Sequence, residues 1–241
     1  MIPEVPDLAR LRAERRAKLV NAFAAHDANA VVLLGTTNVR WATGARVVGA
    51  DQGISARRRN AAVLFANDES PHLFTHMPEG VPADHPDDRV YGGLDVESDA
   101  GAEALVSFVA DRVGAQGRVL LDEWTMPVRR AWKERLGAVA VDDAAINLMG
   151  PLKLIKTVDE LACIRAAQRL NEQAMVDVYA TLAPGVRQCD LSGVFLRRAF
   201  ELGAHQNTVD PIWEVMPESI AAGPRSVTGD LIFPTVTTDR V

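Results

Sequence analysis

The chain has 241 residues, of which 48% are hydrophobic and 24% charged, and its formal net charge is −6 at pH 7. This composition is typical of a soluble globular protein long enough to bury a core. The negative charge argues against nucleic-acid or anionic-membrane surfaces, and no apolar run approaches the ~20 residues that span a bilayer. A charged N-terminus without a signal peptide, and two cysteines, Cys163 and Cys189, indicate a cytoplasmic protein with reduced thiols.

The first part of the chain alternates helical and strand patterns. Residues 7–26 form an amphipathic pattern typical of a helix, and the apolar run 30–35 predicts a buried strand. The next residues predict a turn or short helical link that Gly44 closes. The apolar runs 61–66 and 71–76, separated by a short polar loop, predict a hairpin.

The pattern continues after an irregular stretch, which we expect at 77–97 because it is rich in Pro, Gly and Asp. We then predict a helix at 98–113, capped by Ser98 or Asp99, a strand at 118–122, a helix at 127–136 and a strand at 137–143. Strands that alternate with helices predict an α/β fold, with a mixed sheet flanked by helices.

A domain boundary is predicted near 150–157, where Gly150 and Pro151 break the pattern. Thr157 and Glu160 have the spacing of a capping box, and the long helix that follows ends at Pro184-Gly185. A second helix, 189–202, would be capped by Gly203, and short strands are expected at 210–217 and 230–234. We therefore predict two domains, residues 1–150 and 151–241.

The segment 151–203 resembles the start of the pita-bread domain of Xaa-Pro dipeptidases, aminopeptidase P and creatinase. Its phrases are LIKTVDELACIRAAQRLNEQAM and LAPGVRQCDLSGVFLRRAFELG. The residues that match the family pattern are Lys156, Thr157, Glu160, Ile164, Arg165, Pro184 and Gly185. Residues 1–150 resemble the creatinase-type N-terminal domain of the same family. The resemblance implies that 151–241 is the N-terminal, incomplete portion of an α+β pita-bread catalytic domain.

The resemblance also implies a chemistry for full-length relatives. The peptidases hold two divalent metals, Mn²⁺, Co²⁺ or Zn²⁺, with two Asp, one His and two Glu, and these metals activate a bridging water. Residues 229–235 superficially resemble the phrase that carries the first Asp ligand, with Thr235 in the place of the ligand, but we interpret them as an upstream loop and expect the true phrase to begin after Val241. Phe233 or Pro234 stands in place of a substrate-binding His. Beyond residue 160 the chain has one histidine, His205. We therefore assign the chain no catalytic residue, no metal ligand and no cofactor.

We therefore interpret the chain as a truncated N-terminal fragment of a metal-dependent Xaa-Pro peptidase-like hydrolase that is inactive as given. One alternative is a non-catalytic dimerisation or binding module, because the helices of 160–203 are apolar on one side. Another is a fragment of a creatinase-like amidinohydrolase or a lyase, because creatinase uses the same fold without metal.

The binding candidates lie in the loop from Asn38 to Gly44, which in this family often approaches the partner subunit's active site. The resemblance therefore implies a homodimer in which Asn38, Arg40 and Trp41 contact substrate. Arg40 would contact a substrate carboxylate, and Trp41 would either form an apolar wall or pack beneath the loop. A peptide or small-molecule substrate is expected only in a full-length relative.

Three further groups have open interpretations. The histidines His72, His76 and His85, with Asp84, Asp87 and Asp88, form either a metal site or a solvated loop. The arginines 57–59 either bind a phosphate or form a salt-bridged turn. The pair Asp122-Glu123 follows a strand, and its two carboxylates either belong to a functional site or cap a helix.

Overall fold

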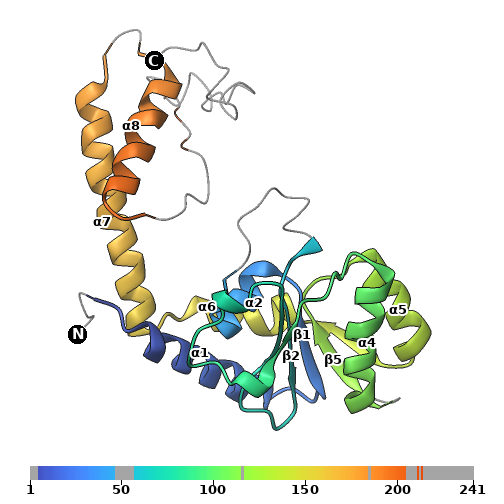
Figure 1. Cartoon of the computed structure of the whole chain (residues 1–241). Coiled ribbons are helices and arrows are strands. Elements are labelled where there is room, and N and C mark those ends of the chain that lie inside the picture. Colours follow the sequence, from blue (N-terminus) through green and yellow to red (C-terminus); the bar gives the residue numbers. More distant parts are fainter. Residues whose placement is uncertain are drawn as a thin grey trace, which may run out of the picture. The chain divides into compact units, whose positions relative to one another are not determined.

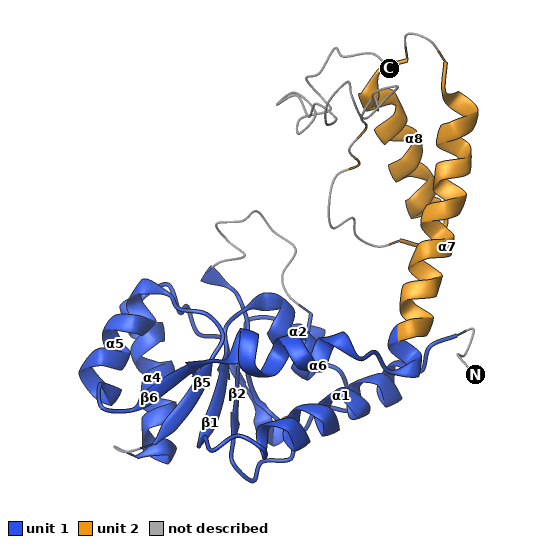
Figure 2. Cartoon of the chain, turned by 180° about the vertical axis from the view of Figure 1, so that it is seen from behind, with its two compact units in different colours: residues 1–160 blue, residues 161–241 orange. Residues whose placement is uncertain are grey.

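A computed structural model describes residues 5–46, 57–114, 117–183 and 186–204, with the single residues 211 and 213. The chain divides into two compact units, residues 1–160 and 161–241, which Figure 2 shows in blue and orange. The predicted turn at Pro184-Gly185, residue His205 and the predicted strand 230–234 lie outside the described residues, as does most of 210–217.

Unit 1 is built on a six-stranded sheet in the order β4-β3-β2-β1-β5-β6. The strands are β1 (Ala30–Leu33), β2 (Ala61–Phe65), β3 (His72–Thr75), β4 (Val90–Gly92), β5 (Arg118–Leu121) and β6 (Ala140–Asp143). Strand β2 runs antiparallel to β1 and β3, whereas β1, β5 and β6 run parallel to one another, as do β3 and β4. The predicted mixed sheet is confirmed.

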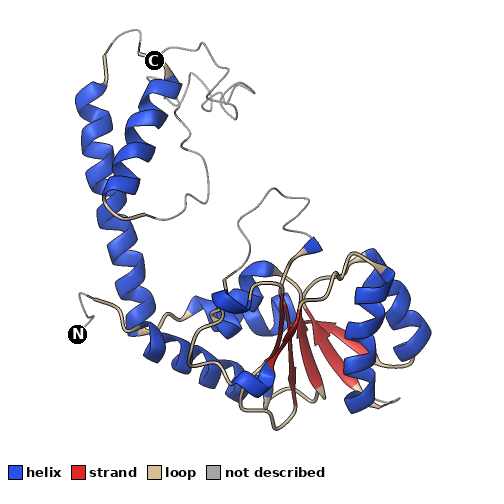
Figure 3. Cartoon of the chain, in the orientation of Figure 1, coloured by secondary structure: helices blue, strands red, loops and turns tan. Residues whose placement is uncertain are grey.

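Helices cover both faces of this sheet (Figures 1 and 3). Helices α4 (Asp99–Val113) and α5 (Met126–Leu136) share one core with Val32, Val63 and Val119. Helices α1 (Leu8–Phe23) and α2 (Thr36–Thr43), with the helical residues 145–154, share the other core with Val31 and Leu120. Because successive strand residues point to opposite faces, a central strand covered on both sides is apolar throughout, which explains the uninterrupted apolar runs in the sequence.

The local signals in the sequence select the ends of these elements. Asp7, Ser98 and Thr125 are the N-caps of α1, α4 and α5, and each side chain accepts a backbone N–H of the first turn. The prediction of Ser98 as a cap is confirmed. Gly44 ends α2 with a φ of 76°, in the left-handed region that favours glycine.

Two parts of unit 1 differ from the sequence prediction. The stretch expected to be irregular, 77–97, contains the edge strand β4, whose three residues are too few to give an alternating pattern. In addition, Gly150 and Pro151, which mark the predicted domain boundary in the sequence, do not interrupt the helical backbone. A π-helical segment, Ala145–Met149, leads directly into α6 (Gly150–Leu154), and Pro151 is the second residue of α6.

Unit 2 contains most of α7 and all of α8. Helix α7 (Val158–Thr181) begins in unit 1 at the predicted capping box, where the hydroxyl of Thr157 accepts the N–H of Glu160 at 3.2 Å. Helix α8 (Gln188–Glu201) buries Leu191 and Ala199. An ion pair of 3.1 Å joins Arg198 on α8 to Asp177 on α7. Among the helices in the described part of the chain, none has the length and apolar composition needed to cross a bilayer.

The core of unit 1 predicts a large effect of Leu120→Ala, because Leu120 is 2% exposed in the centre of β5. We expect the substitution to lower the free energy of unfolding by about 2–5 kcal/mol through lost burial and the cavity left behind. Urea unfolding followed by tryptophan fluorescence measures this. The control is Met126→Ala, which truncates a side chain that is 75% exposed. Equal losses in the two variants would contradict the packing described.

Candidate functional site

The direction of the chain reverses between β1 and β5. These strands are adjacent and parallel, but the chain leaves β1 toward β2 through α2 on one face and leaves β5 toward β6 through α5 on the other. In open α/β sheets, ligands bind outside the carboxyl ends of strands at such a reversal. Gly35 and Asp122 follow the carboxyl ends of β1 and β5, so this position is the candidate site.

The carboxylate of Asp122 occupies this position. It accepts the backbone N–H of Leu34 at 2.7 Å and of Gly35 at 3.1 Å, and the side-chain amide of Asn38 at 2.7 Å. Burial raises the pKa of Asp122, although these hydrogen bonds act to lower it. A Cβ atom at position 35 would lie 2.9 Å from the carboxylate, so only glycine permits this close approach.

Further charges surround Asp122. Lys153 on α6 donates from Nζ to the amide oxygen of Asn38. Burial lowers the pKa of Lys153, whereas the charge of Asp122 acts to raise it. Glu123 is exposed and pairs with Arg59 at 2.8 Å. Asp122, Asn38 and Lys153 therefore form one hydrogen-bonded network. Its evident role is to hold the turn between β1 and α2.

The three predicted binding residues have different surroundings. Asn38 belongs to the Asp122 network. Trp41 is buried, and its indole N–H donates to Glu160 at 3.1 Å. Arg40 is exposed, and it lies in the last turn of α2. The structure thus brings Asn38 and Trp41 to separate internal partners and leaves Arg40 as the one of the three that faces solvent.

A second hydrogen-bonded carboxylate of unit 1, that of Glu160, contacts α2. This carboxylate accepts the N–H of Thr157 at 2.7 Å, forms an ion pair of 2.6 Å with Arg15, and accepts the Trp41 indole. Burial acts to raise the pKa of Glu160, but these hydrogen bonds outweigh it and lower the pKa. The Arg15 guanidinium also lies 5.4 Å from the Trp41 ring centroid. A single carboxylate therefore ties α1, α2 and the first turn of α7 together.

The predicted histidine cluster is dispersed. His72 is buried, 2.9 Å from the Tyr91 hydroxyl and 3.3 Å from Asp68, and Arg89 lies beside it. His85 is buried, and neither of its ring nitrogens has a hydrogen-bond partner within the described structure. His76 is exposed. Across the described ranges, no group of three or more His, Cys, Asp and Glu side chains is placed to hold a metal ion.

The remaining candidates form ion pairs. Asp84, next to His85, pairs with Arg12 at 2.6 Å and Arg16 at 2.9 Å. Burial acts to raise the pKa of Asp84, but the two arginines outweigh it and lower the pKa. Of the arginines 57–59, Arg59 pairs with Glu97 at 2.7 Å as well as with Glu123. The interpretation as a salt-bridged turn is confirmed for Arg59.

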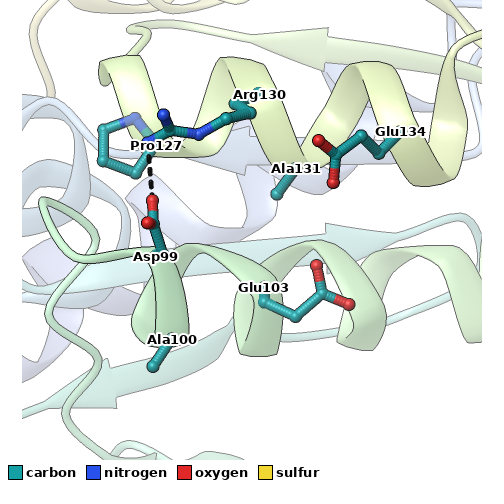
Figure 4. A pocket seen from close by; sticks show the side chains of 7 residues that line it. All are labelled: Asp99, Ala100, Glu103, Pro127, Arg130, Ala131 and Glu134. Atoms are coloured by element: carbon teal, nitrogen blue, oxygen red, sulfur yellow. Dashed lines mark hydrogen bonds and ion pairs between the residues drawn. The ribbon is translucent and has the colours of Figure 1, made fainter.

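An open groove lies between α4 and α5 (Figure 4). Its acidic side chains include Asp99 and Glu103, which are paired with Arg130 at 2.6 Å and Arg135 at 2.5 Å. These are exposed ion pairs between α4 and α5, of a kind that contributes little to stability.

The sequence analysis did not predict the hydrogen-bond partners of Asp122 and Glu160. Lys153 lies in the segment 150–157, where a domain boundary was predicted, and no local pattern connects it with Asn38. Glu160 was predicted correctly as a capping residue, but its bonds to Arg15 and Trp41 join residues far apart in the sequence. The available signal for Asp122 was its place at a strand end, which gave no partner.

Comparison with models of protein families matches residues 15–149 to the Creatinase/Prolidase N-terminal domain. A sequence search of curated proteins finds no match. Solved structures match over more of the chain. The prolidase from Pyrococcus furiosus has a TM-score of 0.60 at 13% identity, covering 79% of this chain and 54% of that chain.

Two other structures give similar values. The recombinant prolidase from Thermococcus sibiricus has a TM-score of 0.62 at 15% identity, covering 83% of this chain and 52% of that chain. The Xaa-Pro dipeptidase from Bacillus anthracis has a TM-score of 0.56 at 16% identity, covering 82% and 50%. At these identities the likeness shows the fold. It extends beyond residue 149, and this chain spans about half the length of each relative.

The Asp122 network predicts that Asp122→Ala destabilises unit 1. The substitution leaves the N–H groups of Leu34 and Gly35 without their acceptor, which should lower the free energy of unfolding by about 2–4 kcal/mol. Urea unfolding measures the change. The matched control is Glu123→Ala, which removes the neighbouring exposed carboxylate and should cost less than about 1 kcal/mol. A larger loss for Glu123→Ala would refute the assigned role.

Burial of His72 and His85 predicts loss of stability in acid. Burial lowers the pKa of both rings, and the positive charges of Arg89 near His72 and Arg16 near His85 act in the same direction. The unfolded chain therefore binds these protons more readily, so the stabilisation present above the ordinary histidine pKa of 6.5 is lost as the pH falls below it.

Chemical unfolding at a series of pH values from 7.5 to about 5 tests this dependence. His85→Gln should flatten the pH dependence relative to the unmodified chain, whereas His76→Gln, at an exposed position, should leave its slope unchanged. An unchanged slope in His85→Gln would count against a buried neutral ring.

Proposed function

This chain belongs to the Creatinase/Prolidase N-terminal domain family, and we propose that it is the N-terminal part of a metal-dependent Xaa-Pro peptidase-like hydrolase. The observation that carries this proposal is the fold similarity to prolidases and a Xaa-Pro dipeptidase, which continues past the matched domain. A creatinase-like amidinohydrolase or a lyase on the same fold is the alternative chemistry, and we place the protein in the cytoplasm.

The proposal assigns the hydrolytic centre to residues other than those described. Full-length relatives would use two divalent metals, Mn²⁺, Co²⁺ or Zn²⁺, to activate water. The described side chains do not fit such a centre, because they form no metal-binding group. We therefore assign no step of hydrolysis to them and propose that residues 1–241 alone are inactive.

For the described residues we propose a role in substrate binding across a homodimer. The exposed guanidinium of Arg40 is suited to a substrate carboxylate, because its planar fork binds carboxylates with two hydrogen bonds. Asn38 and Trp41 would act indirectly, by fixing α2 through Asp122 and Glu160. The buried, hydrogen-bonded positions of these two side chains support a positioning role.

A second proposal is a non-catalytic dimerisation or binding module. The observation that favours it is the exposure of large apolar side chains in unit 2. Ile164 is 50% exposed, Val176 66% and Tyr179 79%, all on α7. Apolar groups repeated on one helix face are typical of surfaces that bind a partner.

An assay of the purified 241-residue chain with Xaa-Pro dipeptides and Mn²⁺ tests the first proposal. We expect no turnover above the rate of a metal-only blank. Substantial hydrolysis that is abolished by a chelator would overturn the proposed inactivity. A prolidase of full length, assayed in parallel, establishes that the substrate and metal conditions support activity.

A further inference from the structure

Helix α2, which carries the exposed Arg40, makes polar contacts with the segment 150–160. The matched family domain ends at residue 149, so this segment follows it in the chain. The segment also ends unit 1, and its last three residues begin α7. Its contacts with α2 therefore join the helix proposed to bind substrate to the part of the chain that leads into unit 2.

Two side chains of the segment reach α2 at positions three residues apart. Lys153 donates from Nζ to the amide oxygen of Asn38, in the first turn of α2. The carboxylate of Glu160 accepts the indole N–H of Trp41 at 3.1 Å, in the second turn. Because residues three apart are neighbours on a helix surface, both contacts hold the same side of α2. Together they fix the rotation of the helix, and hence the direction in which Arg40 points into solvent.

Helix α1 holds the end of this segment in place. Arg10 pairs with Asp159 at 2.6 Å, and Arg15 pairs with Glu160 at 2.6 Å. The Asp159 carboxylate also accepts the backbone N–H of Asp7 at 2.9 Å. In the described structure both carboxylates are buried and paired with α1, but of the two only Glu160 has a hydrogen bond with α2. These two neighbouring carboxylates therefore provide a comparison between a contact with α1 alone and a contact with both helices.

We propose that Lys153 and Glu160 are positioning residues for Arg40 and act together as a clamp on α2. The inference rests on the proposed role of α2 in substrate binding. It deepens that role, because the direction of the substrate-binding guanidinium then depends on the segment at the entry to unit 2. On this proposal the family domain, residues 15–149, lacks two of the side chains that hold its own binding helix.

A clamp and a contact that only adds to overall stability protect different backbone amides. Loss of overall stability accelerates hydrogen exchange in the whole core of unit 1, because core amides exchange through global opening. Loss of a clamp opens α2 locally. The amides of Val39 and Gly44 report on α2, since they donate to the carbonyls of Gly35 and Arg40 at 2.9 and 2.8 Å. The amides of β5 report on the sheet.

Amide hydrogen exchange of the whole chain, followed by NMR, tests the contact of Lys153. Lys153→Met removes the amine and keeps the apolar stem. We expect exchange in α2 to become faster relative to β5 by about tenfold, as for the loss of one hydrogen bond to a charged group. The matched control is Lys133→Met, at an exposed position on α5, which should leave the ratio unchanged. Equal acceleration in α2 and β5, or none in α2, would overturn the clamp.

The same measurement compares Glu160→Ala with Asp159→Ala. Each removes one buried, paired carboxylate from the first turn of α7, but only the first removes a contact with α2. Glu160→Ala should accelerate exchange in α2 relative to β5, and Asp159→Ala should not. If circular dichroism shows that Glu160→Ala is unfolded, Trp41→Phe removes the same hydrogen bond from the other side and keeps an aromatic ring. The same α2 to β5 ratio in Asp159→Ala as in the variant that loses this bond would overturn the role of Glu160.

The exchange measurements contain no substrate, so they test the clamp separately from the proposed function. Calorimetric titration with the dipeptide alanyl-proline compares the unmodified chain with Arg40→Gln, Lys153→Met and Lys133→Met. We expect weaker binding in the first two variants and unchanged binding in the third. Equal binding in the unmodified chain and Arg40→Gln would overturn the substrate-binding role of Arg40. Weaker binding in Arg40→Gln without any change in α2 exchange in Lys153→Met would overturn the clamp alone.

Discussion

The carboxylate of Asp122 is the constraint on which the arrangement around the central strands depends. It follows β5, yet the donors that it accepts in the described structure are the backbone N–H groups of Leu34 and Gly35, in the turn after β1, and the amide of Asn38, in the first turn of α2. A backbone N–H at the end of a buried strand must find an acceptor, and here one side chain from the neighbouring strand accepts two. Gly35, which lies close to this carboxylate, is the residue at which α2 begins.

The position of α2 then determines the surroundings of Trp41 and Glu160. Because α2 is fixed at its start by Asp122, the Trp41 indole reaches the carboxylate that also caps α7 and pairs with Arg15 on α1. Buried carboxylates that remain paired and hydrogen-bonded avoid the cost of an isolated charge in an apolar interior. Glu160 and Asp122 are thus two connected supports for the same helix, and Arg40 is carried by that helix on its exposed side.

Much of unit 1 follows from local sequence. The central strands were predictable because burial on both faces requires unbroken apolar runs, as in 30–35 and 61–66. Two helix starts were predictable because Ser98 and Thr157 satisfy backbone groups within their own first turns. The edge strand β4 was missed because its pairing with β3, rather than its own three residues, makes it a strand. Pro151 gave an ambiguous signal, because proline disrupts a helix interior but is tolerated in the first turn of a helix.

The sequence by itself determined the element types, the capping residues and the resemblance to the family, because these depend on spacing within a few residues or on phrases of consecutive residues. Only the tertiary structure decided that Asp122 holds Asn38, that Lys153 joins them, and that Trp41 meets Glu160. These contacts join residues 84, 115 and 119 positions apart. Their partners are set by strand order and helix placement, which no local pattern encodes.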